Sequence, residues 1–154
     1  MTVTDALKIS SVQYSVEKSS RFPSKFEGKV ENPNKIASIK QASDDFFIHF
    51  AVSAGFSTSN DKPAQVFITL ERKSTEKSLR VNSQCKLNKD TGLYEGSFDV
   101  SKDFEMHFNG DYEITVHSTD YRSQGSVSWK LGTVKIWYKE GLEEGSNNGV
   151  KKEY

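Results

Sequence analysis

Seven residues, Gly110-Asp-Tyr-Glu-Ile-Thr-Val116, show most clearly the pattern that indicates the fold class of this chain. Tyr112, Ile114 and Val116 alternate with polar residues, so they would share one face of an extended strand. The same two-residue period recurs on both sides of this stretch. It predicts strands over residues 7–16, 26–30, 46–52, 66–70, 79–87, 94–100, 112–116 and 127–138. The pattern therefore indicates an all-β chain.

About seven to eight short strands separated by turn residues are typical of an immunoglobulin-like antiparallel β-sandwich. In such sandwiches a tyrosine at the start of the penultimate strand often bonds back to the preceding loop, and Tyr112 has this place. The alternative for Tyr112 is a plain core aromatic. The alternation slips at Ser10-Ser11 and at Gly132, which predicts β-bulges there.

Turn-forming residues predict the connections between the strands. Asn88 to Gly92 reads as a hairpin loop in which Gly92 takes a positive φ. Ser74 to Lys77 reads as a second hairpin turn, and Phe104 to Asn109 as a connection with a possible helical turn. We expect residues 1–140 to form one domain. Residues 141–154, rich in Gly, Asn, Glu and Lys, would be a flexible C-terminal tail or linker.

Composition excludes several classes of function. The 21 basic and 21 acidic residues balance, so the chain lacks the one-sided positive surface that nucleic acid requires. Its longest uncharged apolar stretch, residues 46–56, is too short to span a bilayer, which takes about 20 residues. We therefore expect this chain to be soluble. Cys85 is the only cysteine, so no internal disulfide can form.

Residues with catalytic or metal-binding chemistry are scattered. His49, His107 and His117 lie in separate segments without metal-ligand spacing, and the alternation places His49 and His117 on the outer face, at the surface. Cys85 shares a face with apolar residues, which predicts a buried and inert thiol.

The run Asp99-Val-Ser-Lys-Asp-Phe-Glu105 begins like a calcium loop but lacks the glycine and glutamate that such loops need. We therefore predict no catalytic residue, no metal site and no cofactor.

Three aromatic residues fall on the wrong face of their strands. Phe47, Phe67 and Trp137 point away from the apolar face and would place large rings toward solvent. An ordinary surface aromatic or a ring covered by a loop is one interpretation. The other is a docking surface for a protein subunit, a neighbouring domain or a sugar ring. These three residues are the candidate partner-binding site.

Four ordered motifs in the second half of the chain carry a family resemblance. They are Lys62-Pro-Ala-Gln-Val-Phe-Ile-Thr-Leu70, Tyr94-x-Gly-x-Phe98-Asp-Val100, Gly110-x-Tyr112-x-Ile114-x-Val116 and Trp129-x-Leu131-Gly-x-Val134-x-Ile136. Together they resemble the lumenal β-domain of the ribophorin II family, the non-catalytic, delta-type subunits of oligosaccharyltransferase. The resemblance covers residues 7–138 and is strongest after Lys62.

The resemblance implies a location and a role. The parent protein would be anchored in the endoplasmic reticulum membrane with this domain on the lumenal side, supporting N-linked glycosylation. Its partners would be other oligosaccharyltransferase subunits, with nascent polypeptide or glycan as the alternative. The catalytic groups of that complex belong to another subunit, so no catalytic residue is carried over. An immunoglobulin-like or macroglobulin-like adhesion or glycan-binding module is the alternative, and an enzyme built on a β-sandwich is a third.

Overall fold

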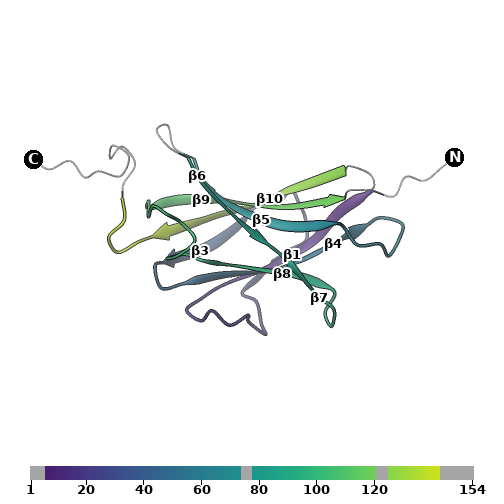
Figure 1. Cartoon of the computed structure of the whole chain (residues 1–154), viewed down its shortest axis with the longest axis horizontal. Helices are drawn as coiled ribbons and strands as arrows, with labels where there is room; N and C mark the ends of the chain where they lie inside the picture. Colours follow the sequence, from purple (N-terminus) through teal and green to yellow (C-terminus); the bar gives the residue numbers. More distant parts are fainter. Residues whose placement is uncertain (1–5, 74–77, 121–124, 143–154) are drawn as a thin grey trace, which may run out of the picture.

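The computed structural model describes residues 6–73, 78–120 and 125–142, apart from the side chains of Ser38 and Lys40. These residues form ten strands and no helix (Figure 1). The strands are β1 (Leu7–Glu17), β2 (Gly28–Val30), β3 (Ala37–Ser43), β4 (Phe47–Phe56), β5 (Gln65–Arg72), β6 (Leu79–Gln84), β7 (Lys86–Asn88), β8 (Leu93–Asp99), β9 (Gly110–Asp120) and β10 (Gly125–Trp137). No membrane-spanning helix occurs within these ranges.

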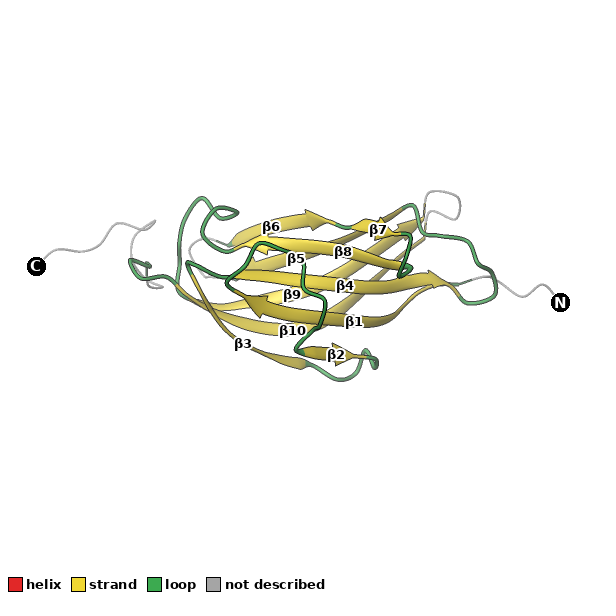
Figure 2. Cartoon of the chain, turned by 90° about the horizontal axis from the view of Figure 1, so that it is seen from below, coloured by secondary structure: helices red, strands yellow, loops and turns green. Residues whose placement is uncertain are grey.

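The strands form two sheets packed face to face, which confirms the predicted all-β sandwich. The first sheet has the order β2-β1-β4-β8-β7 and the second has the order β3-β10-β9-β5-β6 (Figures 1 and 2). All the strand pairs described are antiparallel except β3 with β10, which is parallel. The long pair β1 with β4, from the N-terminal part of the chain, lies in the first sheet. The long pair β9 with β10, from the C-terminal part, lies in the second sheet.

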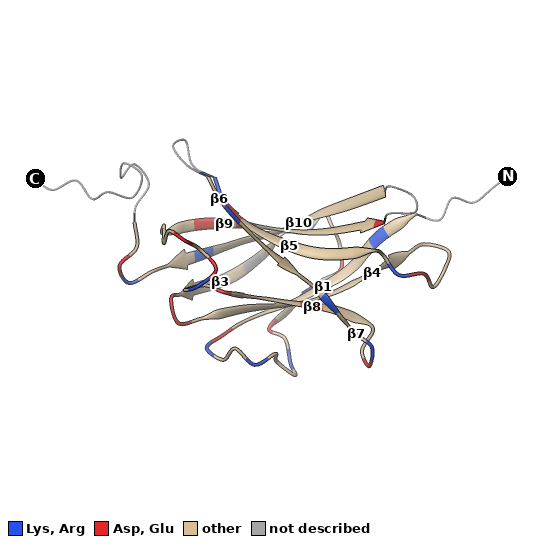
Figure 3. Cartoon of the chain, in the orientation of Figure 1, with Lys and Arg blue, Asp and Glu red and all other residues tan. Residues whose placement is uncertain are grey.

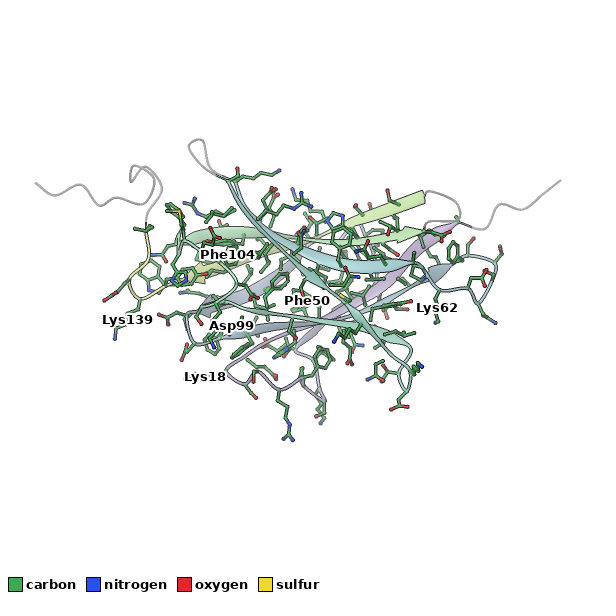
Figure 4. The ribbon with its side chains drawn as sticks, in the orientation of Figure 1. Lys18, Phe50, Lys62, Asp99, Phe104 and Lys139 are labelled. Atoms are coloured by element: carbon green, nitrogen blue, oxygen red, sulfur yellow. The ribbon has the colours of Figure 1, made fainter. Side chains whose placement is uncertain are left out.

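The core lies between the two layers and follows the alternation of the sequence. Phe50 of β4 and Phe98 of β8 pack edge to face at 6.1 Å between ring centroids, and Phe50 points into the space between the sheets in Figure 4. Tyr112, Ile114 and Val116 of β9 are fully buried, as predicted. The period of two therefore identified the buried face correctly in both sheets.

The strand β3 was not predicted. Its sequence, Ala-Ser-Ile-Lys-Gln-Ala-Ser, has no run of large apolar residues, and it is held by parallel pairing with β10. The predicted strand over residues 79–87 is in fact two strands. The chain leaves the second sheet after Gln84 and enters the first at Lys86, so Cys85 sits at the crossing between layers.

Both predicted bulges are present. The register shifts between Ile9 and Ser11 in β1, and between Lys130 and Gly132 in β10. A Cβ atom at Gly132 would lie only 2.2 Å from the carbonyl oxygen of Ala37, so the absence of a side chain lets β3 approach β10. Gly92 has a φ of 74°, as its hairpin position predicted.

One end of the sandwich is closed by hydrogen bonds to backbone carbonyls. The Tyr112 hydroxyl donates to the carbonyl oxygen of Phe108 at 2.6 Å, which is the predicted bond back to the preceding loop. The Tyr138 hydroxyl donates to the carbonyl oxygen of Val100 at 2.7 Å. The connection 104–109 contains no helical turn, so that expectation is wrong: its backbone instead pairs with Leu142, with Phe108 opposite it in a parallel bridge.

Two predictions fall on residues outside the described ranges. The hairpin turn at Ser74 to Lys77 is one of them. The other is most of the tail, residues 143–154. Of the predicted tail, Gly141 and Leu142 are described, and the Leu142 amide donates to the carbonyl oxygen of His107 at 2.7 Å. The first two residues of the predicted tail are therefore hydrogen-bonded to the body of the domain.

Candidate partner-binding surfaces

The three candidate aromatic residues do not share one surface. Phe47 lies on β4 of the first sheet, whereas Phe67 on β5 and Trp137 on β10 belong to the second sheet. All three side chains point away from the core, so the two sheets display them on opposite faces of the sandwich. Phe47 cannot share a docking surface with the other two.

Phe67 and Trp137 lie far apart on the outer face of the second sheet. Phe67 is opposite His117 on β9, which is opposite Ser128 on β10. Trp137 lies nine positions beyond Ser128 along β10, which corresponds to about 30 Å at the usual rise of a strand. The structure thus separates the predicted site into three locations.

Phe47 and Phe67 have ring partners within the chain. The Phe47 ring stacks against His49 with centroids 6.3 Å apart, and the Phe67 ring stacks on His117 at 4.6 Å. Both phenylalanines are half-buried. Trp137 differs because 49% of its surface is exposed. It is therefore the candidate whose apolar surface the described part of the chain leaves open.

Trp137 is surrounded by polar residues. Lys135, two positions earlier on the same face of β10, and Lys139 just beyond the strand are both exposed. Asp111 of β9 is opposite Lys135. An apolar ring with a charged border is the usual composition of a small protein-binding patch, in which tryptophan is enriched at the centre.

The prediction that His49 is a surface residue is wrong. Its side chain is completely buried, because the loop of residues 18–27 between β1 and β2 crosses over the outer face of β4 (Figure 2). The His49 Nε2 lies 3.0 Å from the carbonyl oxygen of Ser19, and Nδ1 lies 2.6 Å from Ser97 Oγ. Since Nε2 must donate to the carbonyl, Nδ1 accepts from the Ser97 hydroxyl in the neutral ring.

His117 is half-buried rather than freely exposed. Its Nδ1 lies 2.8 Å from Ser128 Oγ and its Nε2 lies 3.2 Å from Thr69 Oγ1. Burial, and secondarily the nearby charge of Arg80, lower the pKa of His117 below its usual 6.5. The third histidine, His107, stacks on the buried Tyr138 ring at 4.3 Å. The three histidines thus lie in three separate places, each with its own hydrogen bond or ring contact.

The acidic run 99–105 forms a turn whose carboxylates bond to the turn itself. Asp99 Oδ1 accepts from the Ser101 amide and hydroxyl, and Asp103 Oδ2 accepts from the Asp99 amide at 2.7 Å. Within the described ranges no group of three or more His, Cys, Asp or Glu side chains could hold a metal ion. Figure 3 shows charges of both signs spread over the loops and outer strand positions.

Cys85 is buried at the crossing between the two sheets. A Cβ atom on Gly96 of β8 would lie 2.8 Å from its sulfur, so the thiol packs directly against that strand. Burial raises the pKa of the Cys85 thiol to about 12, which keeps it protonated at neutral pH. The expectation of a buried thiol is confirmed.

A groove on the outer face of the first sheet was not predicted from the sequence. Its walls include Phe22 and Phe26 from the covering loop, and its floor includes Gln13, Ala51 and Glu95 from β1, β4 and β8. The two phenylalanines in an otherwise polar loop were the available signal.

Comparison with models of known protein families found no match, and neither did a comparison with characterised proteins.

Proposed function

We propose that this chain is a non-catalytic recognition and scaffolding domain of an oligosaccharyltransferase accessory subunit of the ribophorin II type. It supports N-linked glycosylation on the lumenal side of the endoplasmic reticulum membrane by holding neighbouring subunits in place. The resemblance of the four ordered motifs provides the setting, and the exposed ring of Trp137 provides the contact. That ring, 49% exposed on an outer sheet face, is the observation that carries the proposal.

The position of Trp137 fits this role. It ends β10, the last strand within the described residues, and the chain then continues through Gly141 and Leu142 toward residues 143–154. In the proposed parent, these residues would lead toward the membrane segment. A contact made at Trp137 would therefore lie on the membrane-proximal side of the domain, where other subunits of a membrane complex meet it.

Co-purification of the tagged parent protein from detergent-solubilised membranes tests the proposal. We expect the wild type to recover the catalytic oligosaccharyltransferase subunit together with oligosaccharide-transfer activity, and Trp137→Ala to lose most of both. Ile36→Ala is the matched control, because Ile36 is an exposed large apolar residue (67%) that precedes β3, far from Trp137 along that strand. Equal recovery in Trp137→Ala and Ile36→Ala, or no transferase subunit with the wild type, would overturn the proposal.

An immunoglobulin-like adhesion module is the second candidate. The order β1-β4-β8-β7 opposite β10-β9-β5-β6 and the hydroxyl bond of Tyr112 both support an immunoglobulin-like arrangement. Surface biotinylation of the tagged parent in intact cells separates the two candidates. Labelling of most of the protein at the cell surface favours adhesion, and retention in the endoplasmic reticulum favours the transferase complex.

A further inference from the structure

The groove on the outer face of the first sheet has the dimensions of a small-molecule site. Its volume is about 450 Å³, and sites for small ligands have volumes of about 300–1,000 Å³. The floor is a row across three neighbouring strands, in which Gln13 pairs with Ala51 and Ala51 pairs with Glu95. Because the middle residue is an alanine, a depression lies between the two longer side chains.

The strands hold the two polar side chains of the floor at a defined separation. Neighbouring strands are about 4.8 Å apart, so the backbones at Gln13 and Glu95 are separated by about 10 Å. Both residues lie inside strands that pair on both sides. Groups mounted on paired strands keep their geometry better than groups on loops.

The floor offers hydrogen bonds that the chain leaves unused. The side-chain amide of Gln13 has no hydrogen-bond partner among the described residues. Glu95 Oε2 accepts from Asn88 Nδ2 at 3.2 Å, and Glu95 Oε1 has no hydrogen-bond partner within the described ranges. An amide both donates and accepts, while a carboxylate accepts, and hydroxyl groups of a ligand match both.

The wall that the 18–27 loop forms above this floor is aromatic, and contacts within the chain hold it in place. Phe22 and Phe26 pack edge to face at 5.6 Å, and Phe22 also packs on the buried His49 ring at 5.5 Å. Two further bonds fix the loop, from the Val16 amide to Glu27 Oε1 at 2.9 Å and from His49 to Ser19. The half-buried rings provide an apolar surface on which the C–H face of a sugar ring packs.

The charges around the groove select for a neutral ligand. Lys29 pairs with Gln13 and Lys86 pairs with Glu95, so a lysine lies at each end of the same cross-strand row. Lys29 forms an ion pair with Glu31 at 3.0 Å. The charge of Lys86 is offset by the Glu95 carboxylate on the neighbouring strand, so the row favours neither a cation nor an anion. A neutral ligand with many hydroxyl groups and an apolar face therefore suits the polar floor, the aromatic wall and the balanced charges of the groove.

We propose that this groove is a binding site for a neutral saccharide. The ring of the sugar packs against Phe22 and Phe26, and its hydroxyl groups bond to Gln13 and Glu95. The proposal goes beyond the proposed function and does not rest on it, because Trp137 lies on the other sheet and its contact is tested by co-purification.

Titration of the isotopically labelled 154-residue chain with maltotriose, mannotriose or triacetylchitotriose, followed by amide NMR shifts, tests the site. We expect at least one of the three to bind saturably with a dissociation constant of about 1 mM or tighter, with shifts at residues lining the groove. Gln13→Ala and Glu95→Gln should each weaken binding about tenfold, the loss that corresponds to one hydrogen bond. The amide spectrum of each variant reports whether it is folded.

Gln41→Ala is the matched control, because Gln41 is an exposed glutamine on β3 of the other sheet. It should bind like the wild type. The proposal fails if none of the three saccharides gives saturable shifts, if the shifts lie outside the groove, or if Gln13→Ala binds as well as Gln41→Ala. It also fails if a neutral phenylalanine tripeptide produces the groove shifts while all three saccharides produce none.

Discussion

The Tyr112 hydroxyl donates a 2.6 Å hydrogen bond to the carbonyl oxygen of Phe108, and both residues are buried. This bond joins the start of β9 to the connection that precedes it. Burial raises the pKa of the Tyr112 hydroxyl to about 12, so it remains a donor throughout the neutral pH range. The connection from β8 to β9 is thereby attached to the core.

Replacement of Tyr112 by phenylalanine should therefore lower the free energy of unfolding by about 1–3 kcal/mol, because a buried carbonyl loses its donor. Denaturation by urea at neutral pH measures the change. Tyr94→Phe is the control, since the Tyr94 ring is also buried but its hydroxyl has no hydrogen bond with the described residues. A Tyr112→Phe value within about 0.5 kcal/mol of the control would show that the bond contributes little.

The two tryptophans should respond in opposite ways to truncation. Trp129 is 3% exposed and lies in the core, whereas Trp137 is 49% exposed. Trp129→Ala should cost about 3–5 kcal/mol of stability, as large buried aromatics do. Trp137→Ala should cost less than about 1 kcal/mol. Thermal and chemical denaturation of the two variants provide the comparison, and a folded, stable Trp129→Ala would contradict the packing described.

Stability should decrease as the pH falls below the unfolded-state pKa of His117. Its folded-state pKa lies below the usual 6.5, so the unfolded chain takes up the proton first and is favoured as the pH falls. Above that pH both states are neutral and the effect vanishes. His117→Gln should show a shallower fall in stability between about pH 7 and 5 than the wild type. NMR titration of the His117 ring checks the direction, and a pKa above 6.5 would contradict it.

Gly132→Ala should disrupt the attachment of β3. The added Cβ would meet the Ala37 carbonyl oxygen at 2.2 Å, so one of the two strands must move. This should lower the free energy of unfolding by about 1–3 kcal/mol. The control is Gly55→Ala in β4, where the nearest atom to the new Cβ is 3.9 Å away. The Ile39 amide should exchange its hydrogen faster in Gly132→Ala than in the wild type, and at the wild-type rate in Gly55→Ala. Unchanged protection there would mean that β3 accommodates the methyl group.

Most of the strands, and the bond of the Tyr112 hydroxyl to the preceding loop, could be predicted because they depend on the local pattern of apolar and polar residues. The alternation around Ile114 and Phe50 determines which side chains face the core, and the breaks at Ser11 and Gly132 mark the bulges. The strand β3 could not be predicted in this way. Its residues do not alternate over its length, and it exists because β10, some 90 positions later, offers it a pairing edge.

The candidate site depended still more on tertiary structure. The sequence alone determined that Phe47, Phe67 and Trp137 point away from the core, since a strand's period of two assigns each side chain to one of two faces. It did not determine which sheet each strand joins, nor which outer faces are covered. Only the folded chain places the 18–27 loop over His49, which buries a residue on an outward position and creates the groove beside it. The physical reason is that exposure on an outer face is set by distant segments that cross it, and no local period encodes their path.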